Sequence, residues 1–364
     1  MKITDIKVTS FSLGKLEKPY WNSIIRSTSR GFSRVDVYTD EGVVGMAPGG
    51  DRSRHVIEGR LKDLLVGEDP LRTDYLWQKM YMGGWRKPVA KGDHIGAMSA
   101  VDNALWDLRG KALGQPVWRM VGGAQSRVRS YAAGGYYQDG KGLKELCAEM
   151  ETYVKMGYKA VKMKVGWSGV TLREDTARVE AVRKAIGPDV DLMVDANNAW
   201  DAITAIKFAR MVEEYEPYWF EEPVHADDFR GGAQVCAALD MPVATGENEF
   251  TRWGFRDLIE AQAADIIQAD PGICGGISEW IKIASMASAY HLNMAPHGGE
   301  HLGAVCVAAV SNGLVTETYP LHQEHMWEFM QRAQFEDGDI VMSDRPGLGI
   351  VWDEAAIERR LAKA

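Results

Sequence analysis

Charged and titratable side chains recur at regular intervals through the second half of the chain. Six of them are separated by steps of 26, 26, 23, 27 and 20 residues, and two lysines precede them: Lys162, Lys164, Asp195, Glu221, Glu247, Asp270, His297 and Glu317. Each step is close to the length of one strand–helix repeat in a parallel α/β barrel. Because equivalent positions on successive barrel strands face the same end, we expect all eight side chains to meet in one pocket.

Three acids in the settings VDAN, FEEP and TGEN predict a site for a divalent cation. Asp195, Glu221 and Glu247 are expected on three adjacent strands, and crowded carboxylates repel one another until at least one is protonated. A hard cation removes that repulsion, and carboxylate oxygens suit Mg²⁺, which keeps ligand positions for water or substrate. The alternative is that each acid caps the helix that follows it. Strand alternation sends Glu221 and Glu222 to opposite faces, so Glu222 is the less favoured ligand.

Two lysines on one face of a strand have the arrangement of a general base and an electrostatic neighbour. Lys162 and Lys164 are two residues apart, so strand alternation places their side chains on the same side. Adjacent ammonium groups lower each other's pKa, which lets one lysine accept a proton near neutral pH. The alternative is that both lysines lie on the surface at the end of a strand.

An aspartate–histidine pair is expected on the opposite side of the pocket. Asp270 and His297 end adjacent predicted strands, and a carboxylate beside a histidine fixes its tautomer and supports its charged form. His301 competes with His297 but is expected to begin the next helix, and a hydrogen-bonded core histidine is the alternative for His297. On the last strand, Glu317 can donate a hydrogen bond to an anionic substrate oxygen if its pKa is raised.

Short apolar segments that alternate with helical stretches are expected to position these groups. The predicted strands are Ser130–Ala133, Ala160–Val165, Asp191–Val194, Tyr218–Phe220, Pro242–Thr245, Asp265–Gln268, Leu292–Ala295 and Leu314–Glu317. One helix begins at the capping-box pattern Thr171–Glu174 and runs to Gly187, and others cover 201–215, 253–263 and 276–290. Eight such units favour a closed parallel barrel over an open sheet.

The first part of the chain is predicted to be a separate α+β unit. Strand-like segments at Ile3–Val8, Phe32–Tyr38 and Val43–Met46 precede a long helix over IGAMSAVDNALWDLRGKALG, which stops at Gly114. The segment Lys18–Arg30 between the first two strands is polar and cationic and is expected to be a capping loop. The final stretch that begins PGLGIVWD is expected to fold back onto this unit.

The composition describes a folded protein without a basic surface. The 364 residues are 46% hydrophobic and 26% charged, with a net charge of −9. These values exclude a disordered chain, a nucleic-acid footprint and a polybasic membrane patch. The four cysteines form no CxxC pair, and the sequence shows neither an apolar leader nor a membrane span, so we expect a reduced, cytoplasmic protein.

The motifs KMK, VDANNAW, WFEEP, TGENEF, QADPGICGG, APHGG and TET together resemble the mandelate racemase subgroup of the enolase superfamily. ALWDLRGKALGQPVWRMVGG resembles the helix and junction that precede the barrel in that superfamily. The resemblance implies an N-terminal α+β capping domain at 1–125, a modified (β/α)7β barrel at 126–325, and a C-terminal segment at 326–364 that packs on the cap. It also implies a symmetric homo-oligomer that acts on a small-molecule carboxylate.

The resemblance also gives each of the eight polar residues a role. It implies Mg²⁺ ligands at Asp195, Glu221 and Glu247, a base at Lys164 beside Lys162, an opposing acid or base at His297 held by Asp270, and a hydrogen-bonding partner of the substrate carboxylate at Glu317. Together, Mg²⁺, Lys162 and Glu317 would stabilise the charge that develops when a proton next to a carboxylate is removed.

Proton-transfer groups on two faces permit either racemisation or β-elimination. We predict dehydration of an acid sugar, an aldonate or aldarate, to a 2-keto-3-deoxy acid, because this activity is common in the subgroup. The polar capping loop also lacks the apolar lining that an aryl substrate prefers, although a merely solvated loop would look the same. Candidate substrate contacts are Trp21, Arg52, Tyr136 and Asn197, with Tyr137 and Trp85 as further candidates.

Three alternative functions remain, two of them enzymatic and one non-enzymatic. The enzymatic alternatives are a racemase or epimerase of a 2-hydroxy acid and a cycloisomerase of a sugar lactone. A non-catalytic, metal-binding relative would lack a base or a ligand, and the sequence lacks neither.

Overall fold

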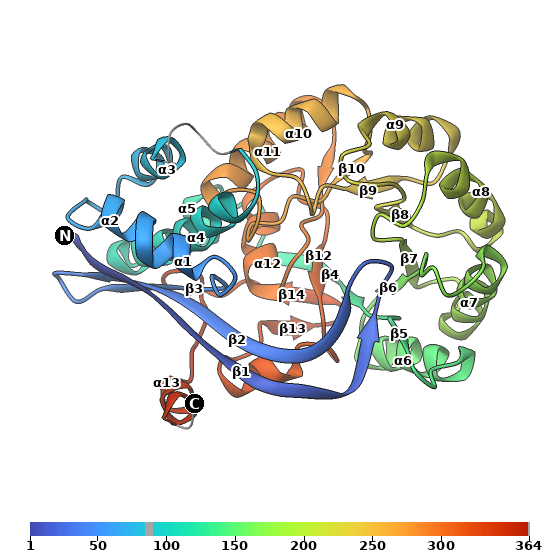
Figure 1. Ribbon diagram of the computed structural model, residues 1–364, viewed down its shortest axis with the longest axis horizontal. Coiled ribbons are helices and arrows are strands. Elements are labelled where there is room, and N and C mark those ends of the chain that lie inside the picture. The colour runs from blue at the N-terminus through green and yellow to red at the C-terminus, as the bar shows by residue number, and fades with distance from the viewer. Residues whose placement is uncertain (84–89, 363–364) are drawn as a thin grey trace.

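The computed structural model describes residues 1–83 and 90–362, so the candidate contact Trp85 lies outside the described residues. The N-terminal part is an α+β unit, as predicted, whose antiparallel sheet has the strand order β3-β2-β1-β5 (Figure 1). Its elements are β1 (Ile3–Trp21), β2 (Arg26–Thr39), β3 (Val44–Pro48), α1 (Arg54–Val56), a π-helical turn (Ile57–Leu61), α2 (Lys62–Leu65), α3 (Thr73–Met82), α4 (Asp93–Leu113) and α5 (Val117–Met120), with β5 (Tyr137–Gln138) added from later in the chain.

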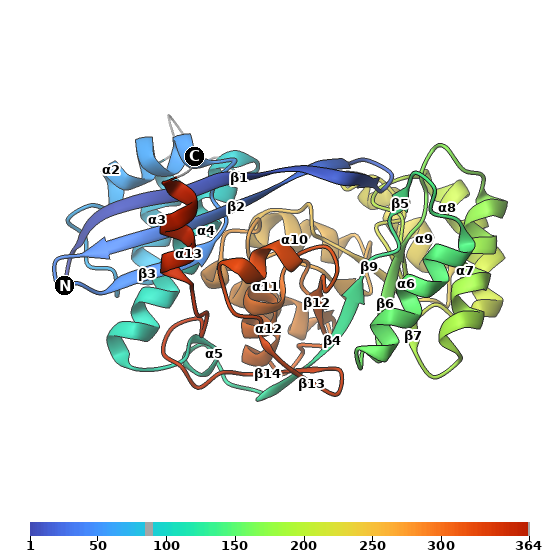
Figure 2. The same cartoon turned by 90° about the horizontal axis from the view of Figure 1, so that it is seen from below.

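The segment Lys18–Arg30 is not the loop that its polarity predicts. β1 and β2 form one long antiparallel hairpin in which Trp21 pairs with Arg26, so only residues 22–25 lie outside the strands. The other edge of β1 is taken by β5, where Trp21 pairs with Tyr137. Pairing on both edges satisfies the peptide groups, and this tertiary contact outweighs the local polarity. The hairpin reaches from the N-terminal helices across the strand array to β5 (Figure 2).

The second part of the chain is a parallel strand array in the order β12-β4-β6-β7-β8-β9-β10-β11. The strands are β4 (Arg127–Ala133), β6 (Ala160–Lys164), β7 (Asp191–Asp195), β8 (Trp219–Glu221), β9 (Val243–Thr245), β10 (Ile266–Ile267), β11 (Asn293–Met294) and β12 (Thr316–Thr318). The regular ladder is an open sheet, because β11 reaches the segment before β12 only through an isolated bridge between Met294 and Gly313. Two backbone hydrogen bonds of 2.8 Å, from Met294 N–H to the carbonyl of Asn312 and from Leu314 N–H to the carbonyl of Met294, make this contact, so the predicted closed barrel is not completed by regular strand pairing.

Helices follow the strands at the predicted places. They are α6 (Leu143–Lys155), α7 (Leu172–Ile186), α8 (Ala202–Val212), α9 (Phe229–Ala238), α10 (Thr251–Glu260), α11 (Ile277–Ala289) and α12 (Glu300–Ala309), with a 3₁₀ turn (Glu213–Tyr215) after α8. The capping box at Thr171 and Glu174 is confirmed, since each residue bonds the other's backbone N–H. The predicted end of the long helix α4 is also confirmed: Gly114 adopts a left-handed conformation with φ of 64°.

The residues after β12 contact both parts of the chain. They form a 3₁₀ turn (Glu324–Glu328), β13 (Gln334–Glu336), β14 (Asp339–Val341) and α13 (Glu354–Leu361). β14 pairs with β4, and the Phe329 ring packs against Phe11 and Phe32 of the hairpin, with centroids 5.1 and 5.0 Å apart. In the described part of the chain, no helix is both long and apolar enough to cross a bilayer.

Candidate active site

The structure brings the eight titratable residues together at the C-terminal ends of the parallel strands. Lys162, Lys164, Asp195, Glu221 and Glu317 lie within β6, β7, β8 and β12, whereas Glu247, Asp270 and His297 lie in the turns after β9, β10 and β11. The charged groups contact one another in series, at distances no longer than 3.8 Å. The series runs from Lys164 to Asp195, Lys162, Glu317, His297 and Glu247. Glu221 also contacts Lys162, and Asp270 also contacts His297. One connected cluster results.

Lys162 lies at the buried centre of the cluster. Its ammonium group forms ion pairs with Glu221 and, at 2.8 Å, with Glu317, and lies 3.7 Å from Asp195. The hydroxyl of Tyr131 is 3.3 Å from the same nitrogen. Because Lys162 is fully buried, these partners replace the water that an ammonium group otherwise needs.

Lys164 and Asp195 form the second ion pair of the cluster. The other oxygen of Asp195 accepts a 2.8 Å hydrogen bond from the backbone N–H of Asn197, and the Lys164 ammonium group lies 5.3 Å from the centre of the Tyr136 ring. Tyr136, a candidate substrate contact, therefore lies beside the candidate base.

His297 and Asp270 form a pair, with Nδ1 of the histidine 2.7 Å from Oδ2 of the aspartate. Nε2 lies 3.7 Å from Glu247 and 3.8 Å from Glu317. The hydroxyl of Tyr319 is also 3.2 Å from Nε2, a contact that the sequence analysis missed. The available signal is the spacing, since Tyr319 lies two residues after Glu317 and on the same face of an extended chain.

The net pKa of each lysine is raised, not lowered as the spacing of the two lysines alone predicts. Burial lowers the pKa of Lys164, but the charge of Asp195, together with Tyr136 and Glu221, outweighs burial and raises the pKa above the ordinary value. Burial opposes Glu221 and Glu317 in the same way at Lys162, whose pKa also rises. Lys162 does lower the pKa of Lys164, as predicted, but the surrounding acidic groups outweigh this contribution and the net shift is upward.

The acids divide according to their neighbours. Burial and the charge of Asp195 raise the pKa of Glu221 to about 8. Burial has the same effect on Asp195, but its contacts with the two lysines outweigh it and hold the pKa of Asp195 below its ordinary value. Acids that crowd one pocket are expected to repel one another, and here this repulsion contributes to the raised pKa of Glu221.

Glu317 and His297 are both held in their charged forms. Burial raises the pKa of Glu317, but Lys162 and His297 outweigh it, so that the net pKa is lowered rather than raised. Glu317 is thus an ionised acceptor and not a protonated donor. Burial opposes the charge of His297, but Glu247 and Glu317 raise its pKa well above the ordinary value, which leaves an imidazolium able to donate a proton.

Three carboxylates are available to a cation but do not surround one point. Within residues 1–83 and 90–362, no three His, Cys, Asp or Glu side chains are grouped closely enough to hold a metal ion. Asp195 and Glu221 are partners in the β7–β8 ladder, and each binds a lysine. Oε2 of Glu247 is buried and has no hydrogen-bond partner. A carboxylate oxygen without a hydrogen-bond donor, 3.7 Å from Nε2 of His297, fits a hard cation such as Mg²⁺ when Asp195 and Glu221 supply further carboxylates.

Glu222 lies in the turn after β8, where its φ of 41° departs from the extended conformation that strand alternation assumes. Its two oxygens accept 2.7 Å hydrogen bonds from the side-chain amides of Asn198 and Asn248. The turns that follow β7, β8 and β9 are thereby joined to one another. These turns are the ones that follow or carry Asp195, Glu221 and Glu247.

The other sequence-predicted residues lie at different distances from the cluster. Asn197 is buried next to Asp195, and its side-chain oxygen has no hydrogen-bond partner. Trp21 packs on Trp167, with ring centroids 5.1 Å apart. His301 is in α12, as expected, and contacts the carbonyl of Gln331 at 3.0 Å. The hydroxyl of Ser23 at the hairpin tip, which the sequence analysis did not single out, donates to the carbonyls of residues 196 and 197.

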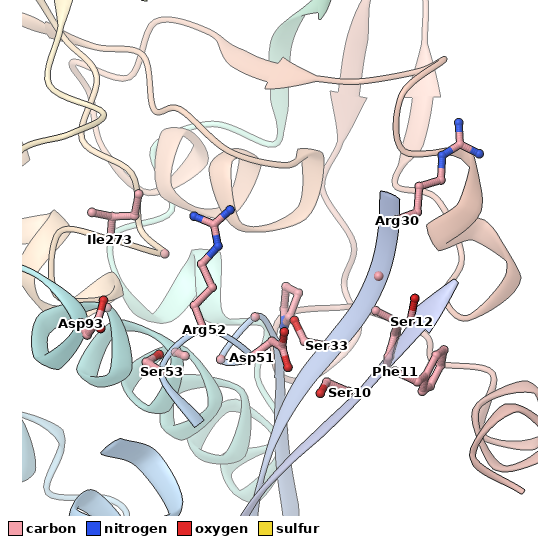
Figure 3. Close-up of a pocket in the computed structure, with 18 of the residues that line it drawn as sticks. Ser10, Phe11, Ser12, Arg30, Ser33, Asp51, Arg52, Ser53, Asp93 and Ile273 are labelled. Carbon is pink, nitrogen blue, oxygen red and sulfur yellow. The ribbon is translucent and has the colours of Figure 1, made fainter. Parts of the chain in front are cut away.

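Arg52 lies in a pocket between the hairpin and the turns after β9 and β10. The pocket has a volume of about 870 Å³, and Figure 3 shows Arg52 and Arg30 among the residues that line it. Ser10, Ser12, Ser33 and Asp51 contribute to its polar wall. Gly272, also in the wall, donates its N–H to Asp270 at 2.5 Å. The pocket therefore adjoins the cluster on the Asp270 side, and Arg52 does not itself belong to the cluster.

Known proteins match this chain along most of its length. The chain is 36% identical to the arabinonate dehydratase of Saccharolobus solfataricus, over 91% of this chain and 90% of that protein. It is 33% identical to the D-galactarolactone cycloisomerase of Agrobacterium fabrum, over 98% of both. The crystal structure of a racemase from Streptomyces coelicolor A3(2) with bound magnesium superposes with a TM-score of 0.89 at 28% identity, over 98% of this chain and 99% of that one.

Two domain families match the chain in series. Residues 5–122 match the mandelate racemase / muconate lactonizing enzyme N-terminal domain, and residues 145–356 match the enolase C-terminal domain-like family. The first domain is the α+β unit that carries the β1–β2 hairpin. The second domain carries the acids and bases at the ends of its strands. The chain belongs to the mandelate racemase / muconate lactonizing enzyme family of the enolase superfamily.

Proposed function

We propose that this enzyme uses Mg²⁺ to dehydrate an acid sugar, an aldonate or aldarate, to a 2-keto-3-deoxy acid. The main support is the placement of Lys164 and His297 at the two ends of the cluster, on either side of the strands that carry the three carboxylates. The similarity to an arabinonate dehydratase supports the same reaction. A β-elimination requires a base for the α-proton and an acid for the departing hydroxyl, and the cluster offers one group for each.

Asp195, Glu221 and Glu247 are the proposed ligands of Mg²⁺. When bound, the ion supplies opposing charge for the oxygens of the substrate carboxylate as negative charge develops on them. Lys162 lies between Glu221 and Glu317, where its ammonium group can stabilise the same charge. Each stabilising donor of this kind is worth about 3 kcal/mol in other enzymes, so several are required together.

Lys164 and His297 carry the two proton transfers. The lysine removes the α-proton, and the electron pair of the C–H bond moves into the carboxylate system. The imidazolium of His297 gives a proton to the β-hydroxyl, which leaves as water when the electron pair returns, and the resulting enol becomes the 2-keto acid. If Asp195 is a metal ligand, the Asp195 charge that raises the pKa of Lys164 would be partly neutralised, and Lys164 would then release its proton more readily.

The polar pocket beside Asp270 is proposed to hold the remainder of the substrate. Its serine hydroxyls and the Arg52 guanidinium offer hydrogen bonds to a polyol chain, and Arg52 can pair with a second carboxylate at the far end. Tyr136, Trp21 and Asn197 are proposed as contacts on the Lys164 side. A cavity of about 870 Å³ falls within the usual range for small-molecule sites.

Domain boundaries at 125 and 325, a homo-oligomeric state and a cytoplasmic location are also proposals. The two matched domain families, which meet between residues 122 and 145, support the first boundary. Light scattering after size-exclusion chromatography measures the oligomeric state directly.

A screen of aldonates and aldarates with Mg²⁺, read as 2-keto acid formation, tests the proposed reaction. We expect turnover of at least one acid sugar, and loss of turnover in Lys164→Met and in His297→Asn. Proton NMR of the products in D₂O distinguishes the alternatives. Deuterium at the α-carbon without keto acid indicates a racemase, and an opened lactone indicates a cycloisomerase, an outcome that the Agrobacterium relative makes worth measuring.

A further inference from the structure

The turn between β10 and α11 is bonded to side chains of α4, a helix of the N-terminal unit. The amide of Asn103 donates to the carbonyl of Pro271 at 2.9 Å and accepts from the N–H of Ile277 at 3.0 Å. The hydroxyl of Ser99 accepts from the N–H of Gly275 at 2.9 Å. One helix therefore satisfies backbone groups at both ends and in the middle of this turn.

These contacts are buried and closely packed. Ser99, Asp102 and Asn103 are fully buried. Gly276 has φ of 85°, and a Cβ atom there would lie 2.4 Å from a carboxylate oxygen of Asp102. A turn with three backbone groups bonded to buried side chains of one helix, at Pro271, Gly275 and Ile277, has little freedom to move independently of that helix.

The same turn begins at Asp270, the partner of His297. The carbonyl of Asp270 accepts from the N–H groups of Ile273 and Cys274 at 2.9 and 2.8 Å. Its Oδ2 lies 2.7 Å from Nδ1 of His297. A continuous series of contacts thus leads from Asn103 to the Pro271–Gly272 peptide, whose N–H donates to Oδ1 of Asp270 at 2.5 Å, and from Asp270 to the imidazole ring.

We infer that Asn103 and Ser99 are positioning residues that hold Asp270, and through it His297, in the orientation needed to protonate the leaving hydroxyl. The effect is confined to one face of the substrate, because Lys164 is on β6 and is held by Asp195 on β7. The inference rests on the proposed function in assigning that proton transfer to His297. It gives the VDNALWD segment a role in catalysis through the Asp270–His297 pair.

The test compares Asn103→Ala with Asp107→Asn in the Mg²⁺-loaded protein. Asp107 lies on the same helix and is equally enclosed, but it accepts from the N–H groups of Met46 and Leu348, not from the turn. With an acid sugar in D₂O, we expect Asn103→Ala to lower the rate of elimination by at least about tenfold, as small misplacements of catalytic groups do. Exchange of the α-proton in recovered substrate, which reports on Lys164, should change by less than about twofold.

A second readout does not require turnover. The Nδ1–H proton of His297 bonded to Asp270 gives a low-field imidazole resonance, assigned by its disappearance in His297→Asn. We expect this resonance to weaken or shift in Asn103→Ala and to be unchanged in Asp107→Asn. If wild-type enzyme eliminates water from no acid sugar, the proposed function fails, while the resonance still decides the positioning role.

Ser99→Ala, which removes one hydroxyl and leaves Asn103 in place, serves if Asn103→Ala does not fold. An unchanged His297 resonance in the folded variant overturns the inference. Equal losses of elimination and of α-proton exchange overturn it as well, because they indicate a general structural defect.

Discussion

Asp102 provides a direct measure of how tightly the N-terminal unit is joined to the parallel strands. Its carboxyl group is fully buried and accepts hydrogen bonds from the N–H and the hydroxyl of Ser278, at 2.9 and 2.7 Å. Burial raises the pKa of Asp102 to about 7, helped by repulsion from Glu279, against the bonds from Ser278 and the charge of Lys282. The folded protein therefore binds a proton at this position more tightly than the unfolded chain does.

An acid whose pKa rises on folding stabilises the folded state at low pH and loses that contribution as the pH rises. The shift from 3.8 to about 7 corresponds to about 4 kcal/mol, at about 1.36 kcal/mol for each pKa unit. The contribution is complete below a pH of about 3.8 and is lost as the pH passes about 7. About 2.5 kcal/mol of it is lost between about pH 5 and about pH 8.

Asp102→Asn replaces the titratable group with a neutral amide of the same size. We expect the free energy of unfolding of the variant, relative to the wild type, to rise by about 2.5 kcal/mol between about pH 5 and about pH 8. Urea unfolding followed by tryptophan fluorescence at the two pH values measures this change as a relative shift of the midpoints. A difference that is the same at both pH values means that Asp102 is ionised in both states, and the reasoning is then refuted.

Three further substitutions test the site. Glu247→Gln should weaken Mg²⁺ binding by at least about tenfold in calorimetric titration, since it neutralises a proposed ligand, and removal of Mg²⁺ by EDTA should abolish turnover until Mg²⁺ is restored. Tyr319→Phe removes the hydroxyl that is 3.2 Å from Nε2 of His297 and should lower kcat by about tenfold while leaving Mg²⁺ affinity unchanged. Arg52→Met should raise KM by about tenfold for an aldarate but by less than about threefold for the matching aldonate, because only the aldarate carries a second carboxylate.

Features that depend on neighbouring residues in the sequence could be predicted from it. The capping box at Thr171 requires only a glutamate three residues later, and the end of α4 requires only a glycine free to adopt positive φ. The position of each polar residue at a strand end could be predicted from the sequence for a similar reason. A polar side chain after a short apolar run marks the place where a buried strand reaches the surface of the array.

Features that depend on partners far apart in the sequence could not be predicted in this way. Residues 18–21 and 26–30 extend the hairpin because β5, more than 100 residues later, covers the edge of β1. The pKa values of Lys162 and Lys164 follow from carboxylates on three other strands, not from their spacing of two residues. The ladder is open where β11 meets the segment before β12, because only an isolated bridge joins them, and segment polarity does not report which residues pair there.

The charge balance of the cluster links the sequence pattern to the requirement for a cation. Five carboxyl groups, at positions 195, 221, 247, 270 and 317, face the ammonium groups of Lys162 and Lys164 and the ring of His297. With every group ionised, the cluster carries two negative charges in excess, in a place that water reaches poorly. Burial and the charge of Asp195 raise the pKa of Glu221 to about 8, and the proton that Glu221 then holds removes half of the excess. A dication among Asp195, Glu221 and Glu247 removes all of it, whereas a monovalent ion cannot, and this difference favours Mg²⁺ on electrostatic grounds as well as by ligand type.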